Sequence, residues 1–442
     1  MYEQLRRILP LTADTSDGLL AIGGVDVREL ADRFGTPLIA YDGAHVETAA
    51  QAWMDAAALL PAGATVAYAT KAFSSIGMLQ RLGELGLGAD VSSLGELEVA
   101  RRAGIDPDLV VLHGNNKSRA ELEAAVGWGV GLIVLDAESE LELLEDVARV
   151  AGRVQPVLVR VNPDIVVETH RYISTSHAGS KFGVPGDVAS RMLERAHASD
   201  FLDARGVHLH LGSQLLDTSP WRRVLEWMAG WARDLRDRTG IVVRTLDVGG
   251  GLGIAYVEDQ QPPAPSDIAS AVRDALEGAW SDARLDMPHV VLEPGRGIVG
   301  QAAITIYSVG VVKQTGHDEI RYVNVDGGMS DNPRPSLYQA RYRALLAERC
   351  DDAPDGSWWV AGVHCESGDV LVEDAELPAP RTGELLVVPA TGAYAASMAS
   401  TYNQVPRCAV VWVANGDAEL LLRRETVDDL LARDAAVGTV PA

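Results

Sequence analysis

The chain has 442 residues, of which 47% are hydrophobic, and a formal net charge of -24. This length and apolar content suffice for a large buried core and for two domains, one of which could be a barrel of about 250 residues. The negative charge argues against nucleic acid and anionic membrane surfaces as partners, because both are bound through clustered Lys and Arg, and it favours small-molecule chemistry.

Cysteine usage and the N-terminal segment indicate the compartment. Cys350, Cys365 and Cys408 lie far apart, and none of them has C-x-x-C spacing. This pattern predicts neither a disulfide framework nor a metal site. No apolar stretch follows the N-terminal charges, and no apolar run is long enough to span a membrane. We therefore expect a cytoplasmic protein with no membrane segment and no bound metal.

The first part of the chain is predicted to form short strands around one helix. Residues 18–22 and 37–42 have the pattern of strands, and residues 27–34 have that of a helix. A second helix is predicted over residues 44–60, where Pro61 stops it. We expect residues 1–43 to join a β domain formed by a later part of the chain.

Strand-sized apolar runs then alternate with helical segments. Such alternation predicts right-handed βαβ units and a parallel sheet, and eight strands are the number that closes a (β/α)8 TIM-type barrel. The helix predicted over residues 44–60 would supply the eighth helix. An open doubly wound sheet is the alternative, but a sheet of that kind usually shows a dinucleotide fingerprint. The eight runs are 65–70, 88–93, 109–114, 132–137, 156–162, 206–213, 245–251 and 289–296.

Polar residues gather at the carboxyl ends of these runs, where barrel enzymes keep their active sites. A lone lysine at a strand end, such as Lys71, is usually a solvated surface charge. At the mouth of a barrel it can instead form a Schiff base with an aldehyde cofactor. Each of the other residues alone is more often structural. The group comprises Lys71, Asp90, His113, Asn115, Asp136, Arg160, Asn162, His208, His210 and Ser213.

The last two runs end in residues suited to a phosphorylated cofactor. Residues 249–251 are adjacent glycines, which let backbone N–H groups turn toward an anion. Residues 293–296, Glu-Pro-Gly-Arg, place a carboxylate and a guanidinium at the same end of the barrel. The loops after strands seven and eight are the usual phosphate site of this fold. With Lys71 for the aldehyde carbon and Glu293 for a ring nitrogen, this is the equipment for pyridoxal 5'-phosphate (PLP).

After about residue 300 the pattern changes to β-rich segments. We therefore predict a PLP-binding barrel over residues 44–300 and a β domain built from residues 1–43 and 301–442. The strands predicted in the later part are 303–313, 320–325, 358–363, 384–389 and 409–413.

Three polar islands, 326–338, 364–369 and 391–394, interrupt the predicted β domain. Loops of this composition could be turns only. A functional role is favoured by Cys365 beside Glu366 and by a second arginine, Arg334, since these side chains suit proton transfer and carboxylate binding.

Several of these motifs together resemble one enzyme family. Cys-Glu-Ser-Gly-Asp at 365–369, Glu-Pro-Gly-Arg at 293–296 and the loop 326–338 closely resemble the diaminopimelate decarboxylase family of alanine-racemase-like (fold type III) PLP enzymes. The resemblance extends from about residue 18 to residue 431. It implies decarboxylation of meso-2,6-diaminopimelate at its D centre to L-lysine and CO2, the last step of lysine biosynthesis. It also implies a homodimer whose active sites are shared between subunits.

The resemblance further implies a role for each site residue. Lys71 would form the Schiff base, His210 would stack on the pyridine ring, and Cys365 would donate a proton in the site of the other subunit. The residues implied to hold PLP are Lys71, Asp90, His210, Ser213, Gly249, Gly250, Gly251, Glu293, Pro294, Gly295, Arg296 and Tyr394. The residues implied to contact substrate are Arg296, Arg334, Tyr338, Glu366 and Tyr394.

Two other functions remain open at this point. A related decarboxylase could act on ornithine, lysine, arginine or carboxynorspermidine, but a substrate without a second carboxylate would not need Arg334. A non-catalytic PLP-binding protein could keep Lys71 but would have no use for Cys365, Glu366 and Tyr394. The long segment 164–183 after the fifth run is a candidate lid over the site.

Overall fold

The computed structural model describes residues 2–163, 180–315 and 320–435. The candidate lid falls largely on residues 164–179, which lie outside the described part of the chain. The chain divides into two compact units. The barrel unit comprises Glu47–Ile254 and Gln261–Ile298, and the β unit comprises Met1–Val46, Ala255–Gln260 and Val299–Ala442.

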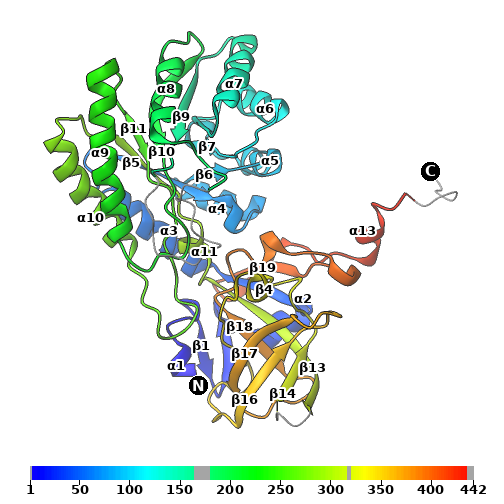
Figure 1. The fold of residues 1–442 in the computed structure, drawn as a ribbon. Helices are drawn as coiled ribbons and strands as arrows, with labels where there is room; N and C mark the ends of the chain where they lie inside the picture. The colour runs from blue at the N-terminus through cyan, green and yellow to red at the C-terminus, as the bar shows by residue number, and fades with distance from the viewer. Residues whose placement is uncertain (1, 164–179, 316–319, 436–442) are drawn as a thin grey trace. The chain divides into compact units, whose positions relative to one another are not determined.

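Eight parallel strands close into a barrel in the order β10-β11-β12-β5-β6-β7-β8-β9. Figure 1 shows the helices that alternate with these strands lying outside them. The predicted (β/α)8 barrel is confirmed, and the open sheet is excluded because β12 pairs with β5. The strands are β5 (Ala64–Ala69), β6 (Gly88–Val91), β7 (Val110–Leu112), β8 (Leu132–Leu135), β9 (Gln155–Arg160), β10 (Leu202–His208), β11 (Thr245–Asp247) and β12 (His289–Leu292).

The helices of the barrel begin and end where the local sequence specifies. Ser75, Ser93 and Ser118 each accept a hydrogen bond from the backbone N–H three residues further on. Gly104 and Gly129 end two of these helices in the left-handed conformation. The helices are α3 (Gly43–Ala57), α4 (Ile76–Glu84), α5 (Leu94–Ala103), α6 (Arg119–Trp128), α7 (Glu138–Ala151), α8 (Gly186–His197), α9 (Ser219–Thr239) and α10 (Pro265–Ala275).

All eight barrel strands end earlier than the apolar runs that predicted them. The run 245–251 contains only the short strand β11, because Gly249 adopts a positive φ of 67° and turns the chain. In contrast, β10 begins before the predicted start at residue 206. The sequence did not indicate this earlier start, because Asp203 and Arg205 interrupt the apolar pattern there. The predicted site residues therefore lie mainly on the loops that follow the strands.

A buried ion pair braces the barrel next to β7 and β8. The Lys117 Nζ atom lies 2.7 Å from Glu140 Oε1, and it also donates to the carbonyl oxygens of Gly114 and Val134 at 2.8 and 2.6 Å. Both charged side chains are buried. Burial lowers the pKa of Lys117, and Glu140 opposes that shift. Removal of either side chain would therefore leave the other as a buried charge without a partner.

The β unit is built around a mixed sheet with strand order β17-β16-β14-β13-β4-β19-β20, in which β18 also pairs with β13 and β15. The N-terminal strand β4 (Leu38–Asp42) lies between β13 and β19, which confirms that the N-terminal segment joins the β domain. A small separate sheet contains β1 (Asp14–Ser16), β2 (Leu19–Ile22) and β3 (Val25–Asp26). The other strands are β13 (Ala303–Thr315), β14 (Ile320–Val325), β15 (Leu345–Leu346), β16 (Gly356–Ala361), β17 (Val370–Leu377), β18 (Leu385–Pro389), β19 (Ala409–Ala414) and β20 (Asp417–Leu422).

Short helices complete the described chain. They are α1 (Tyr2–Leu5), α2 (Val27–Phe34), α11 (Arg296–Val299), α12 (Arg334–Tyr338) and α13 (Val427–Leu431). Among the residues that the structure describes, no helix is both long and apolar enough to cross a membrane.

Candidate active site

Lys71 lies in the turn Thr70–Ala72 directly after β5. Its Nζ atom is 2.8 Å from Asp90 Oδ2 on the neighbouring strand β6. The lysine side chain is 45% exposed, whereas that of Asp90 is 2% exposed. The structure thus places an accessible amine at the carboxyl end of the barrel, with a buried carboxylate to orient it.

The glycines after β11 form a turn that no larger residue would fit. A Cβ atom on Gly250 would lie 2.1 Å from the carbonyl oxygen of Glu293, and one on Gly251 would lie 2.3 Å from that of Gly212. The Asp247 side chain holds this turn by accepting a hydrogen bond of 2.8 Å from the Gly249 N–H. The close backbone packing is what a phosphate-binding loop needs, so these residues fit the phosphate of PLP.

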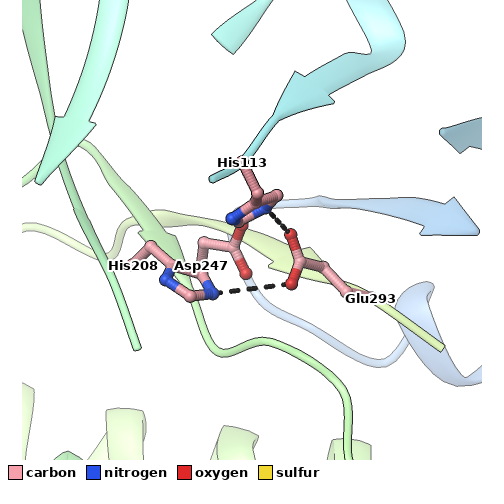
Figure 2. Close-up of side chains that lie close together, drawn as sticks. All are labelled: His113, His208, Asp247 and Glu293. Atoms are coloured by element: carbon pink, nitrogen blue, oxygen red, sulfur yellow. Dashed lines mark hydrogen bonds and ion pairs between the residues drawn. The ribbon is translucent and has the colours of Figure 1, made fainter. Parts of the chain in front are cut away.

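Glu293 follows β12 and lies in a buried cluster with His113, His208 and Asp247 (Figure 2). The His113 Nε2 atom is 2.5 Å from Glu293 Oε1, and the His208 Nε2 atom is 3.5 Å from Glu293 Oε2. The four ligand-type atoms lie within 4.8 Å of one another, as in a metal site. A tetrahedral Zn²⁺ with ligands at about 2.0–2.2 Å keeps its ligand atoms about 3.3–3.6 Å apart. The contact between His113 and Glu293 is therefore a hydrogen bond.

Burial and neighbouring charges set the protonation states in this cluster. Burial alone would raise the pKa of Glu293, but His113 and His208 outweigh burial and hold that pKa well below its usual value. Burial, and then the charge of Glu293, raises the pKa of Asp247 well above its usual value. Burial lowers the pKa of His208 to about 3. At neutral pH the cluster therefore contains the ionised Glu293 beside a neutral His208, and Asp247 holds its proton more tightly than an ordinary carboxyl group.

His210 lies just after β10, next to the glycine turn. A Cβ atom on Gly249 would come within 2.9 Å of its Nδ1 atom. Burial first, and then the positive charges of Lys71 and Arg160, lowers the pKa of His210 well below its usual value. The ring is neutral at pH 7, which suits stacking on another aromatic ring.

The segment after Glu293 closes this side of the site. The carbonyl oxygen of Pro294 accepts a hydrogen bond of 3.0 Å from the Ala69 N–H, and a Cβ on Gly295 would lie 2.9 Å from the Cβ of Ala69. The buried Arg296 donates through Nη2 to Ser213 Oγ at 2.8 Å. Two predicted residues from different strands are thus brought into contact.

In the β unit, Arg334 begins α12 and is only 6% exposed. Its Nη1 atom donates to the Tyr342 hydroxyl, and its guanidinium carbon lies 4.4 Å from the Tyr256 ring centroid. Burial opposes the effect of these tyrosines, yet the pKa of Arg334 is raised above its usual value. Within the described residues, no carboxylate forms an ion pair with this guanidinium. The geometry is that of a buried cation ready to receive an anion.

The other predicted residues of the β unit lie on turns. Cys365 and Glu366 are exposed on the turn between β16 and β17, where the Cys365 N–H donates to Asn403 Oδ1 at 3.1 Å. Tyr338 ends α12, and Tyr394 lies after β18 with a positive φ of 61°. The predicted site residues of the barrel lie together in the barrel unit. Arg334 lies with Tyr256 and Tyr342 in the β unit.

The partners of Glu293 and Arg334 received no role from the sequence, whereas Asp90 beside Lys71 and Ser213 beside Arg296 were both predicted to bind PLP. Only His113 and His208 were noted as strand-end residues, and Asp247 was not singled out, although the common position of all three at the carboxyl ends of barrel strands was a usable signal. Tyr256 and Tyr342 were missed altogether, because no spacing pattern marks aromatic residues that meet a distant arginine.

The barrel, the lysine after its first strand and the glycine turn define the class of protein. The model of the family described as "Pyridoxal-dependent decarboxylase, pyridoxal binding domain" matches residues 44–300. The chain is therefore a PLP-dependent enzyme of the decarboxylase class, and the predicted cofactor is confirmed.

Full-length relatives narrow this class. The chain is 42% identical over 419 residues to the diaminopimelate decarboxylase of Bacillus subtilis, with 94% of this chain and 95% of the relative covered. It is 42% identical over 427 residues to that of Mycobacterium tuberculosis, with 94% of each chain covered. A crystal structure of diaminopimelate decarboxylase from M. jannaschii with L-lysine is similar at a TM-score of 0.90 and 32% identity, over 96% of this chain and 98% of that one. The chain belongs to the diaminopimelate decarboxylase family, as the sequence motifs predicted.

Proposed function

We propose that the protein decarboxylates meso-2,6-diaminopimelate at its D centre and releases L-lysine and CO2. The observation that carries this proposal is Arg334, a buried cation that has only tyrosine hydroxyl and ring contacts among the described residues. A buried charge without a counter-ion is costly, so the site favours a ligand that brings a carboxylate. Diaminopimelate keeps a second carboxylate at its L centre, whereas a diamino acid with one carboxylate, such as lysine or ornithine, loses it in the reaction and leaves a diamine.

The residues of the barrel unit would bind and orient the cofactor. When bound, PLP supplies an electron sink for the pair of electrons left as the carboxylate departs. Lys71 would hold its aldehyde carbon before substrate exchange, with Asp90 orienting the amine. The glycine turn and Ser213 would bind the phosphate, while His210 would lie against the ring. Glu293, kept ionised by its histidine neighbours, would face the ring nitrogen and hold a proton there.

Residues of the β unit, together with Arg296 of the barrel unit, would bind the rest of the substrate. Arg334 and Arg296 would hold the distal carboxylate, and Glu366 would pair with the distal ammonium. Tyr338 and Tyr394 would line the same site. Cys365 would deliver the proton that replaces the departing carboxylate.

We also propose that Cys365 acts in the site of a second copy of the chain. Its exposure on a turn supports this, since a proton donor must be shielded from water during the reaction and a partner surface would provide that shield. The enzyme would then be a homodimer with a two-fold axis and two shared sites. All three cysteines are free, which supports a place in the reducing cytoplasm.

Purified protein loaded with PLP tests the activity directly. It is incubated separately with meso-diaminopimelate, ornithine, lysine, arginine and carboxynorspermidine, and CO2 release is followed. We expect release from meso-diaminopimelate alone, and none after Lys71→Ala. Preferred release from another of these amines would identify a related decarboxylase, and release from none would favour a PLP-binding protein without catalytic activity.

A further inference from the structure

Glu293 has two imidazole neighbours, and one of them holds it far more closely than the other. The His113 Nε2 atom lies 2.5 Å from Glu293 Oε1, whereas the His208 Nε2 atom lies 3.5 Å from Glu293 Oε2. The His113 and Glu293 side chains are 8% and 3% exposed. Because both are buried, bulk water cannot readily replace His113 as the donor to this carboxylate.

His113 also faces a second carboxylate. Its Nε2 atom lies 3.8 Å from Asp90 Oδ1, and the other oxygen of Asp90 receives Lys71 Nζ at 2.8 Å. Only the contact with Glu293 is within hydrogen-bonding distance, so the Nε2 proton is directed to Glu293. The ring of His208 also faces His113, at 4.7 Å between centroids in an edge-on arrangement.

The other members of the cluster support the negative charge of Glu293 less directly than His113 does, and Arg160 acts on it through charge alone. His208 is neutral at pH 7, because burial lowers its pKa to about 3, and Asp247 is an acid that burial and the charge of Glu293 make harder to ionise by raising its pKa. One oxygen of Asp247, Oδ1, accepts from the Gly249 N–H of the glycine turn. Among these described neighbours, His113 is the group that stabilises a negative charge on Glu293 through a short, direct contact (Figure 2).

We propose that His113 is a positioning residue that keeps Glu293 ionised and aimed at the cofactor ring nitrogen, so that this nitrogen retains its proton. The inference rests on the proposed function and adds a residue to it. Without His113, Glu293 would be a buried carboxylate lacking its closest donor, and such a group takes up a proton itself. A neutral carboxylic acid gives no electrostatic support to a protonated ring nitrogen.

The protonation of the ring nitrogen can be measured without turnover. The holoenzyme is loaded with PLP that carries ¹⁵N in the ring, and the ¹⁵N chemical shift is followed against pH. We expect a protonated nitrogen at pH 7 in the wild type and an unprotonated one in His113→Phe, which keeps a ring but removes the donor. His113→Gln, which keeps a side-chain N–H donor, should lose the ring proton at an intermediate pH.

A matched control separates this effect from general damage to the barrel. His289 also lies on a barrel strand, where its Nε2 bonds Thr65 Oγ1 at 2.8 Å, and it belongs to none of the contacts around Glu293. His289→Phe should leave the ¹⁵N shift unchanged. If His113→Phe does not fold, the comparison of His113→Gln with the wild type still decides the matter, since an unchanged shift there would contradict the proposal.

Cofactor affinity provides a second, independent measurement. PLP is compared with its 1-deaza analogue, in which a ring C–H replaces the nitrogen. His113→Phe should weaken PLP roughly ten- to hundredfold, the usual range for a hydrogen bond to a charged group, and should leave the analogue unaffected. Equal losses for both ligands, or a ring nitrogen still protonated in His113→Phe, would overturn the role of His113. A wild-type protein that neither binds PLP nor releases CO2 would instead overturn the proposed function.

Discussion

The role proposed for Arg334 leads to a comparison of two ligands that differ by one carboxylate. L-Lysine keeps the carboxylate of the L centre, and 1,5-diaminopentane is the same chain without it. We expect Arg334→Gln to weaken L-lysine and to leave 1,5-diaminopentane nearly unchanged. The reason is that the arginine is buried over Tyr256 and would meet only the ligand that carries the anion.

The size of the loss follows from the surroundings of Arg334. Removing one partner of a buried, hydrogen-bonded charge pair costs roughly 2–5 kcal/mol. The proposed site provides Arg296 as a second cation for the same carboxylate, so we expect the lower part of this range. A loss of about 2–3 kcal/mol corresponds to about 30- to 150-fold weaker binding of L-lysine.

Calorimetric titration of the PLP-loaded enzyme with each ligand measures both affinities. Arg343→Gln is a matched control. Arg343 also lies after α12, but its guanidinium already pairs at 2.9 Å with the carboxylate of Glu258, which is more exposed than Arg343 itself. This substitution should change neither affinity. Arg334→Lys keeps the charge but loses the planar fork, so it should recover only part of the L-lysine affinity. Equal weakening of both ligands by Arg334→Gln would refute the reasoning and assign Arg334 to packing.

Three further predictions concern assembly and stability. Inactive Lys71→Ala and inactive Cys365→Ala chains are mixed, dissociated and reassembled. This should restore about 25% of wild-type activity per site, because half of the dimers contain one intact shared site. No recovery despite demonstrated exchange of subunits would rule out shared sites. Lys117→Met should lower the free energy of unfolding by about 3–5 kcal/mol in denaturant titrations, since it leaves the buried carboxylate of Glu140 without its partner. Adding Glu140→Leu should regain most of this loss. Burial raises the pKa of Asp331 to about 6, so the folded state binds the proton more tightly than the unfolded chain, and stability should fall as pH rises from about 4 to 6. Asp331→Asn should remove this fall and gain about 3 kcal/mol at pH 7, as thermal melts across that pH range would show.

The regular part of the fold was predictable because each βα repeat is specified by local signals. Apolar runs, the capping serines Ser75 and Ser93, and glycine at helix ends all act within a few residues of sequence. Strand ends were less predictable, since apolar residues continue past the point where Gly249 turns the chain. Strands such as β17 and β20 were missed because their exposed positions carry polar residues.

The positions of the cofactor residues were also predictable, whereas their partners were not. Lys71 and Glu293 lie at strand ends, and the fold brings those ends together. The contact between His113 and Glu293 depends on how two strands far apart in sequence are placed across a closed barrel. The buried pair of Lys117 and Glu140 likewise depends on tertiary packing, because the sequence alone gives no sign that these two charges are buried.

Strand β4 has a consequence for how the chain is made. Leu38 at its start pairs with Ile306 on one side and with Ala409 on the other. On a ribosome, all barrel strands emerge before either partner of β4 exists. At roughly 5–20 residues per second, the apolar strand waits tens of seconds with both edges unpaired. An unpaired apolar strand is a template for association with other chains, so chaperone demand during synthesis should centre on this N-terminal segment and should end only when the last strands of the β unit leave the ribosome.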